Sequence, residues 1–369
     1  MTSLFECECY AATQKENSLK SQAMFKKMLI LLIWLAYPFA IYAQVGGQAS
    51  FTALRLPVDA RTVGLGGTNI SAQQQDVNRF IANPALLNDS VQGHASVSYM
   101  RWQASTDLFQ LNYAPRLPKV GLIGIGLQVL NYGKMPLTLP NGIQQGTFTA
   151  NDITIGITKN FKKRYFTYGA TLKYVGSQIA TYNAVGVAFD VGGTFQHPKH
   201  DFLIALTVKN IGFTVNNYTN TRLNLPFDIL LGTTIKPKYM PLRFSITLQH
   251  LYRWDIVYLD SLKSNQLDAN GNIVPLKKTA GDKFLRHLVL GSELILSKSL
   301  QILVGYNHLQ AREMRLDDVG GLRGFSFGLR FQTAKWQCSF ARGLYAVGSG
   351  RNMLTINGNL NKMIRKKSL

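Results

Sequence analysis

The sequence predicts an all-β transmembrane barrel of about fourteen antiparallel strands with a small N-terminal plug or lead-in segment. Two observations carry this prediction. Apolar and polar residues alternate in segment after segment from about residue 94 to the C-terminus, and the connections between the segments alternate between short and long. A period of two marks a strand with two different faces. A barrel in a lipid bilayer uses such strands with the apolar face out and the polar face in.

The front end of the chain has the features of a secretory signal peptide. Lys26 and Lys27 precede an apolar run over 28–39, and small residues end the segment at Ala43. The run is shorter than the roughly 20 residues that a membrane span needs, so we expect cleavage after Ala43 rather than an anchor. Residues 1–43 are therefore assigned to the signal, and residues 1–23 to a start codon placed too early.

The composition fits an exported membrane protein. The 369 residues carry a net charge of +21, yet only 16% of them are charged. A basic balance can indicate nucleic-acid binding, but an exported chain argues against nucleic acid. Basic rims that meet outer-membrane lipid and lipopolysaccharide as anionic partners, or a basic lumen, are expected instead. No run of eighteen apolar residues follows residue 44, so no helical span is expected there.

The strand prediction covers residues 91–369 as one barrel domain. Alternation is clear at 153–158, where Ile alternates with Thr and Gly, and at 325–331, where Phe and Leu alternate with Ser, Gly and Arg. Small and polar residues would line the lumen, where Gly leaves room for neighbouring groups. The expected segments are 94–102, 107–114, 120–130, 150–161, 165–176, 185–195, 201–211, 226–236, 241–251, 286–296, 299–308, 321–331, 334–345 and 350–360.

The connections give the barrel an expected orientation. Those after even-numbered segments are short, as at 162–164 and 297–299. Transmembrane barrels have short periplasmic turns and longer outer loops, so the long connections would face outward. We expect outer loops at 131–149, 177–184, 212–225, 252–285 and 309–320.

Aromatic residues near the segment ends could form interfacial girdles, although ordinary strand aromatics would look the same in the sequence. The candidates are Tyr99, Trp102, Tyr132, Tyr165, Tyr174, Trp254, Trp336 and Tyr345.

Residues 44–90 do not read as membrane strands and are expected to form the N-terminal plug or lead-in. A glycine block at 64–67 permits tight turns, and Asn83 is expected to cap a short helix with Pro84 in its first turn. The block lacks the Lys-Ser/Thr pair of a phosphate loop, so phosphate binding is not expected. The residues assigned to this structural motif are Arg61, Gly64, Gly66, Gly67, Asp76, Asn83, Pro84 and Ala85.

These motif residues resemble the N-terminal signature of the PorV/PorQ family, relatives of the FadL outer-membrane transporters. The opening run at 46–51, the step at 76–78 and the ending at 355–361 resemble the PorQ branch more narrowly. The resemblance covers the whole mature chain and implies a FadL-like barrel of the type IX secretion system of Bacteroidetes. The chain departs from many outer-membrane barrels in ending with a basic tail at 364–369 rather than an aromatic residue, and we expect that tail to be an unpaired extension.

No catalytic constellation, cofactor motif or metal-ligand cluster stands out, so an enzyme is not expected. His197 and His200 share a predicted turn without a carboxylate or Cys at ligand spacing. Glu293 and Asp190 fall on strand segments and could face the lumen, paired with Lys173, Arg330 or Arg342. Such a network would be structural or would line a pore or ligand site.

Two functions remain open. The resemblance implies a role in protein secretion, in which outer loops such as 252–285 hold a PorZ-like surface partner of the PorU sortase machinery. The alternative is FadL-like transport of hydrophobic small molecules across the outer membrane. An apolar pocket between plug and wall would favour transport, and a lumen filled by charged side chains would count against it.

Overall fold

The structure is a computed structural model that describes residues 50–72, 75–102, 105–219, 224–257, 279–313, 321–346 and 349–361. The chain divides into two compact units, Met1–Gln48 and Ala49–Leu369, and every described residue belongs to the second. The expected signal peptide and its cleavage point therefore lie outside the described residues. So do residues 258–278 of the longest expected loop and the basic tail at 364–369.

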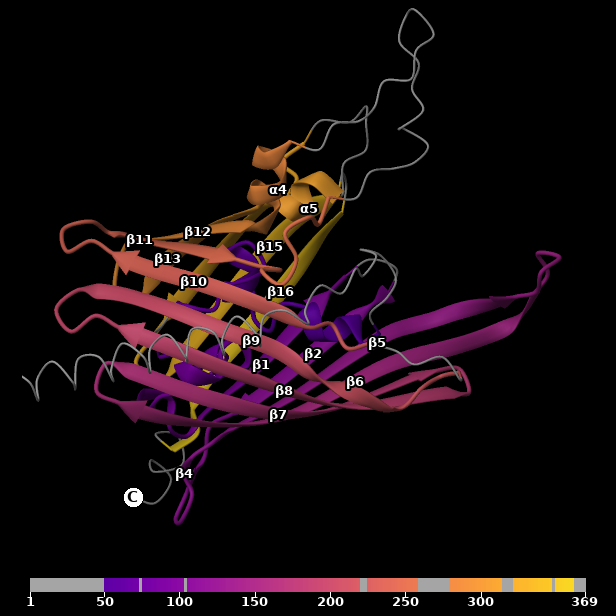
Figure 1. The fold of residues 1–369 in the computed structure, drawn as a ribbon, viewed down its shortest axis with the longest axis horizontal. Helices are drawn as coiled ribbons and strands as arrows, with labels where there is room; N and C mark the ends of the chain where they lie inside the picture. The colour runs from indigo at the N-terminus through magenta and orange to yellow at the C-terminus, as the bar shows by residue number, and fades with distance from the viewer. Residues whose placement is uncertain are drawn as a thin grey trace, which may run out of the picture. The chain divides into compact units, whose positions relative to one another are not determined.

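Fourteen antiparallel strands form a closed barrel, which confirms the predicted fold class (Figure 1). A separate two-stranded sheet, β3 with β4, lies in the connection between β2 and β5. The strands of the structure are β1 (His94–Arg101), β2 (Asp107–Tyr113), β3 (Arg116–Leu117), β4 (Gly121–Leu122), β5 (Gly124–Thr138), β6 (Gln144–Lys163), β7 (Phe166–Ile179), β8 (Tyr182–Gln196), β9 (Asp201–Asn216), β10 (Asp228–Lys236), β11 (Leu242–Leu248), β12 (Leu288–Ile295), β13 (Leu300–Asn307), β14 (Phe325–Gln332), β15 (Trp336–Ala346) and β16 (Ser349–Asn359).

Each barrel strand pairs with its neighbours along the chain, and the last strand returns to the first. The β1–β16 register runs from His94 opposite Asn359 to Arg101 opposite Asn352. Closure gives the backbone groups of both terminal strands a partner, which matters because each unpaired group in lipid would cost several kcal/mol.

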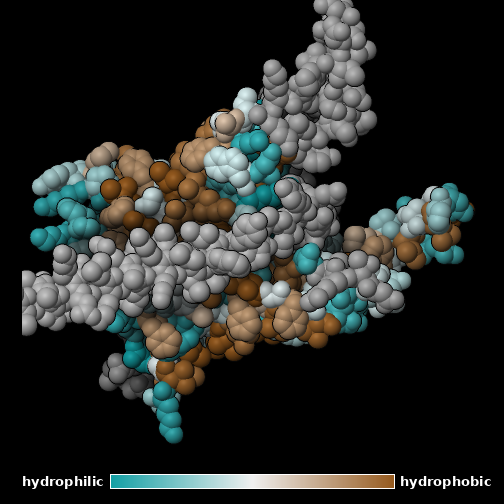
Figure 2. All heavy atoms as spheres, viewed as in Figure 1, coloured by the Kyte–Doolittle hydropathy of each residue, from teal (hydrophilic) through white to brown (hydrophobic). Residues whose placement is uncertain are grey.

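The two faces of the wall differ as the alternation predicts. On β14, the outward side chain of Leu329 is 53% exposed and the inward side chain of Arg330 is 1% exposed. Ile153, Ile155 and Ile157 on β6 also point outward, while Thr154 and Thr158 are buried. Figure 2 shows apolar side chains over the middle of the visible wall and hydrophilic ones toward the strand ends. An exterior of this kind is matched to the interior of a bilayer.

Two of the expected outer loops are wrong, because the strands continue through them. β5 and β6 extend past the rest of the barrel as a two-stranded ribbon over residues 134–149, where a loop at 131–149 was expected (Figure 1). β7 and β8 leave only residues 180 and 181 between them, where a loop at 177–184 was expected. The register shift between Asn131 and Lys134 marks where the ribbon leaves the barrel.

Two short helices occupy connections at the long-loop end. α4 (Ala280–His287) begins at Thr279, whose side chain accepts a hydrogen bond from the Asp282 backbone N–H. α5 (His308–Glu313) follows β13 directly. No helix in the described ranges is long and apolar enough to cross a membrane.

The described N-terminal residues fold into short helices packed inside the barrel. These are 3₁₀-helices at Thr52–Arg55, Pro84–Leu86 and Asp89–Val91, with α2 (Ala60–Gly64) and α3 (Arg79–Ala82). Ala60 and Val63 of α2 are fully buried in one cluster with Leu108 and Met353, which belong to strands. Phe80 of α3 packs in a second cluster that includes Leu122.

The girdle prediction is wrong for two of its residues. Trp102 lies under the guanidinium of Arg351, 3.7 Å from the ring centroid, and lines a cavity. Tyr132 lines the same cavity and donates a hydrogen bond to Asp152 at 2.8 Å. Tyr165, Tyr174 and Trp336 are exposed, as a girdle requires. The side chain of Tyr345 lies outside the described part of the structure.

Candidate functional site

The N-terminal segment is built around a capped turn of helix. Asp59 is the N-cap of α2 and accepts hydrogen bonds from the backbone N–H and the hydroxyl of Thr62. The helix ends at Gly64, and Gly66 and Gly67 follow with φ of 94° and 86°. Only glycine adopts such angles readily, so the glycine block lets the chain reverse direction inside the lumen.

Arg61 of α2 joins the segment to the barrel wall. Its guanidinium lies 2.6 Å from Glu293 of β12. The second carboxylate oxygen of Glu293 lies 2.6 Å from Arg243 of β11. Arg61 and Glu293 are almost completely buried, so one carboxylate holds two arginines at a point where water is largely excluded.

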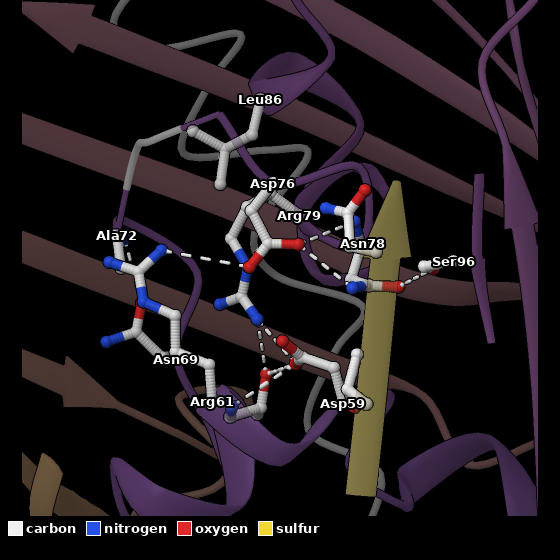
Figure 3. A network of polar contacts seen from close by, with 12 residues as sticks. Asp59, Arg61, Asn69, Ala72, Asp76, Asn78, Arg79, Leu86 and Ser96 are labelled. Carbon is white, nitrogen blue, oxygen red and sulfur yellow. Dashed lines mark hydrogen bonds and ion pairs between the residues drawn. The ribbon is translucent and has the colours of Figure 1, made fainter. Parts of the chain in front are cut away.

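Arg79 of α3 extends the network within the segment itself. Figure 3 shows its guanidinium between Asp59, to which it is hydrogen-bonded, and Asp76. Asp76 lies 3.7 Å from Arg79 and 4.0 Å from both Arg61 and Arg330 of β14. Asn78 accepts a hydrogen bond from Ser96 of β1 (Figure 3). The network thus ties the N-terminal segment to strands on several sides of the lumen.

This ion network serves to hold the N-terminal segment in place and adds little net stability. Burying ions costs several kcal/mol each, and a good pair roughly returns that cost. Removing one partner is different, because it leaves a buried charge without compensation. Four arginines face three carboxylates here, and each arginine lies within 4.0 Å of at least one of them.

The Asn83-Pro84-Ala85 element turns the chain against β7 and β8. Asn83 accepts a hydrogen bond from the Ala85 N–H at 3.0 Å and donates one to the Ile70 carbonyl at 3.3 Å. Pro84 stands at the first position of the helix, so the expected cap is present in this form. Gly169 and Gly192 face the turn, and a Cβ on either would clash with Pro84 or Asn83.

Inward glycines of the wall make the space that the N-terminal segment fills. Such glycines occur on six strands between β5 and β13, and each has an N-terminal residue where its side chain would be. The pairs are Gly124 with Phe80, Gly126 with Ile81, Gly169 with Pro84, Gly192 with Asn83, Gly232 with Ile70, Gly291 with Leu65 and Gly305 with Gly66.

A second charged cluster lies where β9 bulges. The register shifts between Phe189 and Val191, and Asn210 has φ of 58°. Asp190 accepts a hydrogen bond from the freed Asn210 N–H at 2.8 Å and forms an ion pair with Lys173 at 2.5 Å. The bulge directs Lys209 and Asn210 to the same side of the sheet, as bulges do.

A cavity of about 420 Å³ lies between the N-terminal segment and the long-loop side of the wall. Its apolar lining comes from both partners: Leu54, Leu56, Pro57 and Val58 from the segment, and Trp102, Leu130, Leu230 and Leu309 from the barrel. Its polar lining includes Lys209, for which the described residues provide no hydrogen bond or ion pair. Asp228 also lines it and lies 3.1 Å from His250.

A second cavity of about 840 Å³ lies on the short-turn side, with Gln75 and Ala85 in its lining. Its rim is basic, with Lys159, Lys162 and Arg164 among its residues. The two cavities share no lining residue. The two cavities are therefore formed by different parts of the N-terminal segment and of the wall.

Helices α4 and α5 meet above the first cavity through one acidic residue. Asp282 lies 2.9 Å from Arg286, 3.2 Å from Arg312 and 3.4 Å from His308. Burial alone would raise the pKa of Asp282, but these cationic neighbours outweigh it and hold that pKa below its ordinary value. Burial raises the pKa of Glu313, which lines the cavity, above its usual value.

The structure brings Arg61 and Asp76 together, and it places the other predicted motif residues against different strands of the wall. Arg61 and Asp76 share the ion network, and the three glycines and the Asn-Pro-Ala element pack on the wall. Asp190 pairs with Lys173 as expected, and Glu293 faces inward as expected but pairs with Arg61 and Arg243. In the described ranges, no three His, Cys, Asp or Glu side chains are grouped to hold a metal ion.

One expected lumen residue is misplaced, and three network residues, among them Asp59, were missed. Arg342 is exposed on the outer face of β15, so it is not an inward partner. The residue parity of β15 indicates this, because the even-numbered Trp336 and Phe340 are also exposed. Arg79 and Arg243 were not predicted as network residues. The sequence feature that could have identified them is a charged residue at an inward or non-strand position within an otherwise apolar stretch.

Comparison with known proteins finds similar folds at low sequence identity. A mutant of the TodX monoaromatic hydrocarbon channel matches with a TM-score of 0.46 and 14% identity, over 81% of this chain and 96% of that one. A FadL homologue from Pseudomonas aeruginosa matches at 0.43 and 10%, over 82% and 98%. The KdgM porin matches at 0.31 and 7%, over 72% and 98%.

These matched structures are described as channels and porins. No family model matches the sequence, and no curated protein matches it.

Proposed function

We propose that this chain is an outer-membrane β-barrel that binds a small, largely apolar molecule on the loop side of its N-terminal plug, as the first step of a FadL-like uptake. The observation that carries the proposal is the cavity of about 420 Å³ between plug and wall. Its size is within the roughly 300–1,000 Å³ of small-molecule sites. An apolar pocket at this place is the feature that separates transport from a purely structural barrel.

The lining favours a ligand with an apolar body and one polar or anionic group. Leucines from the plug and from β5 and β10 would contact the body. Lys209 supplies a cation that forms no close ion pair within the described residues, although Asp228 lies opposite it in the β9–β10 register. An ammonium in such a place gains from a ligand anion because it is partly withdrawn from water.

Passage beyond the cavity requires the plug to move. The ion network of Arg61, Asp76 and Glu293 lies within the lumen, and the cavity on the short-turn side has other lining residues. This charged lumen counts against an open pore. It is compatible with a barrel that binds its ligand in one state and releases it in another.

A matched pair of substitutions on β10 tests the binding site. Leu230 is buried in the cavity lining and Leu231 points outward. Leu230→Trp would place an indole in the cavity and should weaken binding of the fluorescent probe 1-aminoanthracene to the purified protein in detergent, whereas Leu231→Trp should leave binding intact. Equal binding by both variants would remove the cavity from the proposal, and uptake of labelled fatty acid that does not depend on the protein would remove FadL-like transport.

A second candidate function is a surface anchor in the type IX secretion machinery, as the family resemblance implies. The β5–β6 ribbon favours it. Residues 135–151 carry no charge, and Leu137, Leu139 and Ile143 are exposed beyond the barrel. Isolated two-stranded ribbons are marginally stable in water, and their open edges can pair with another chain. A PorZ-like surface protein is the partner that this function would require.

The anchor is tested by shortening the ribbon. Replacing residues 134–148 with an Asn-Gly turn removes the ribbon and leaves the β5–β6 pairing up to Asn131 opposite Asn151 intact. Loss of the surface partner from cells that still insert the barrel would support the anchor. Deleting most of 256–282 tests the longest outer loop in the same way. Unchanged retention of the partner by both deletions would exclude these loops as the anchor.

A further inference from the structure

The outer face of the barrel is uncharged over most of its wall, with one local exception at the long-loop end. Outward positions there carry Arg342 on β15, Asn352 on β16 and Arg101 on β1, and all three side chains are exposed. Asp107 follows on β2. Where side chains are described, the remaining outward positions at this end carry no charged residue, the projecting ribbon aside.

The register places these residues side by side. Asn352 lies directly opposite Arg342 on one side and Arg101 on the other. Neighbouring strands are about 4.8 Å apart, so the two arginine backbones are roughly 10 Å apart with Asn352 between them. Two long guanidinium side chains can therefore converge on a single group that rests over Asn352.

Neither guanidinium has an acidic partner in the described part of the chain. Asp107 lies across from Arg101, and its carboxylate accepts a hydrogen bond from Tyr99 at 2.7 Å. Arg101 contacts the same Tyr99, and among the described ion pairs none joins Arg101 to Asp107. The patch therefore keeps a positive balance on a surface that otherwise meets hydrocarbon. It lies within a few residues of the strand ends, where an outward arginine costs only about 0–1 kcal/mol because it can reach the head-group layer.

We propose that Arg101, Asn352 and Arg342 form a binding site for the phosphate group of a lipid in the outer leaflet, of the phosphorylated glycolipid class. Guanidinium groups bind phosphate oxygens through paired, charge-assisted hydrogen bonds. The Asn352 amide adds a neutral donor between them. The site spans the seam where β16 meets β1, so a bound head group would cross-link the last strand to the first.

The inference rests on the proposed membrane location and on no property of the lumen or its ligand. The outer leaflet follows from the long-loop end, because longer loops face outward in such barrels. The membrane location has a test of its own: a mature chain that stayed folded and monodisperse without detergent would contradict it.

The test uses the full barrel in detergent micelles, with lipid binding measured by native mass spectrometry. The probes are a bis-phosphorylated lipid A, its dephosphorylated form, phosphatidylglycerol and inorganic phosphate. We expect bis-phosphorylated lipid A to bind most tightly and the dephosphorylated form to bind at least about tenfold more weakly, the loss expected when charge-assisted contacts disappear. Inorganic phosphate alone should not bind measurably, since it lacks the acyl chains that hold a head group at the level of Arg101 and Arg342.

The variant R101Q/R342Q should lose the same tenfold or more. The matched control is K162Q/K163Q, which removes the same charge from the exposed turn at the opposite end. R101K/R342K keeps the charge without the paired geometry and should bind with intermediate strength. Heat-modifiable migration on gels shows that each variant retains the barrel.

Three results would overturn the site: unchanged binding of bis-phosphorylated lipid A by R101Q/R342Q, an equal loss in K162Q/K163Q, or inorganic phosphate binding as tightly as the lipid.

Discussion

The inner and outer faces of β12 show how one strand serves two surroundings. Glu293 points inward and lies 2.6 Å from both Arg61 and Arg243. Leu290, three residues away, points outward and is exposed. Charge on the inner face holds a separate segment of the chain in place, while apolar groups on the outer face carry the burial in lipid. On β12, charge therefore lies on the face where the protein itself supplies the counter-charge.

The largest effect that tests this comparison is the loss of Glu293. Glu293→Ala leaves Arg61 and Arg243 buried without their shared carboxylate, so the free energy of unfolding should fall by about 3–5 kcal/mol. Urea unfolding in lipid vesicles measures it. The neighbouring outward substitution Ser292→Ala should change stability little, and equal effects of the two would break the contrast between the faces.

Placing a charge on the outer face should cost nearly as much. Leu329→Arg puts an unpaired cation near the middle of the wall and should lower the unfolding free energy by about 2–4 kcal/mol. Leu344→Arg, on the outward face close to a strand end, should cost about 0–1 kcal/mol. The same vesicle assay applies. A Leu329→Arg barrel as stable as Leu344→Arg would mean that this face does not meet hydrocarbon.

Adjacent glycines on β8 sharpen the comparison at a smaller scale. A Cβ at Gly192 would clash with Asn83, whereas a Cβ at Gly193 would lie 3.8 Å from Tyr168, an ordinary contact. Gly192→Ala should destabilise the folded barrel by about 1–3 kcal/mol through overpacking, and Gly193→Ala should be close to neutral. The difference in urea midpoint between the two variants reports whether the N-terminal segment occupies the lumen.

The smallest expected effect concerns the half-buried charge of Asp282 outside the barrel. The cationic neighbours of Asp282 hold its pKa below the ordinary value, so its contribution is present at neutral pH and is lost as pH falls through the lowered pKa. The contribution should be below about 1 kcal/mol, as for other ion pairs near a protein surface. Hydrogen exchange of Ala280–His287, corrected for intrinsic rates, should show protection at pH 7 that weakens at low pH. Asp282→Asn should lose this dependence, and a wild-type profile that is flat with pH would refute the assignment.

Much of the barrel follows from residue parity alone. All fourteen expected segments coincide with barrel strands, because apolar residues at alternate positions are required wherever one face meets lipid. Parity fails beyond the membrane, where neither face is constrained. In the sequence the β5–β6 ribbon therefore resembles a loop, because Pro136, Pro140 and Gly142 are turn-forming residues inside or beside the paired strands.

The ion network could be predicted only in part. The alternation along β8 and β12 places Glu293 and Asp190 on the lumen face. Their ion-pair partners depend on which residue of the N-terminal segment lies at the same level along the barrel axis. Arg61 is 232 residues from Glu293 in the sequence, and only the folded N-terminal segment brings them together. Arg342 shows the opposite case: its parity with Phe340 already placed it outside, and its charge alone suggested a lumen partner.

A spin-label scan along β14 tests the central claim most directly. Single cysteines at residues 326–331, in a Cys338→Ser background and a lipid bilayer, report whether each side chain meets oxygen dissolved in the lipid or a water-soluble nickel complex. We expect accessibility to oxygen to alternate with a period of two residues. Labels at Phe327, Leu329 and Phe331 should be accessible to oxygen, and labels at the positions between them should be protected by the packing in the lumen. Access of the nickel complex to the odd positions would contradict it.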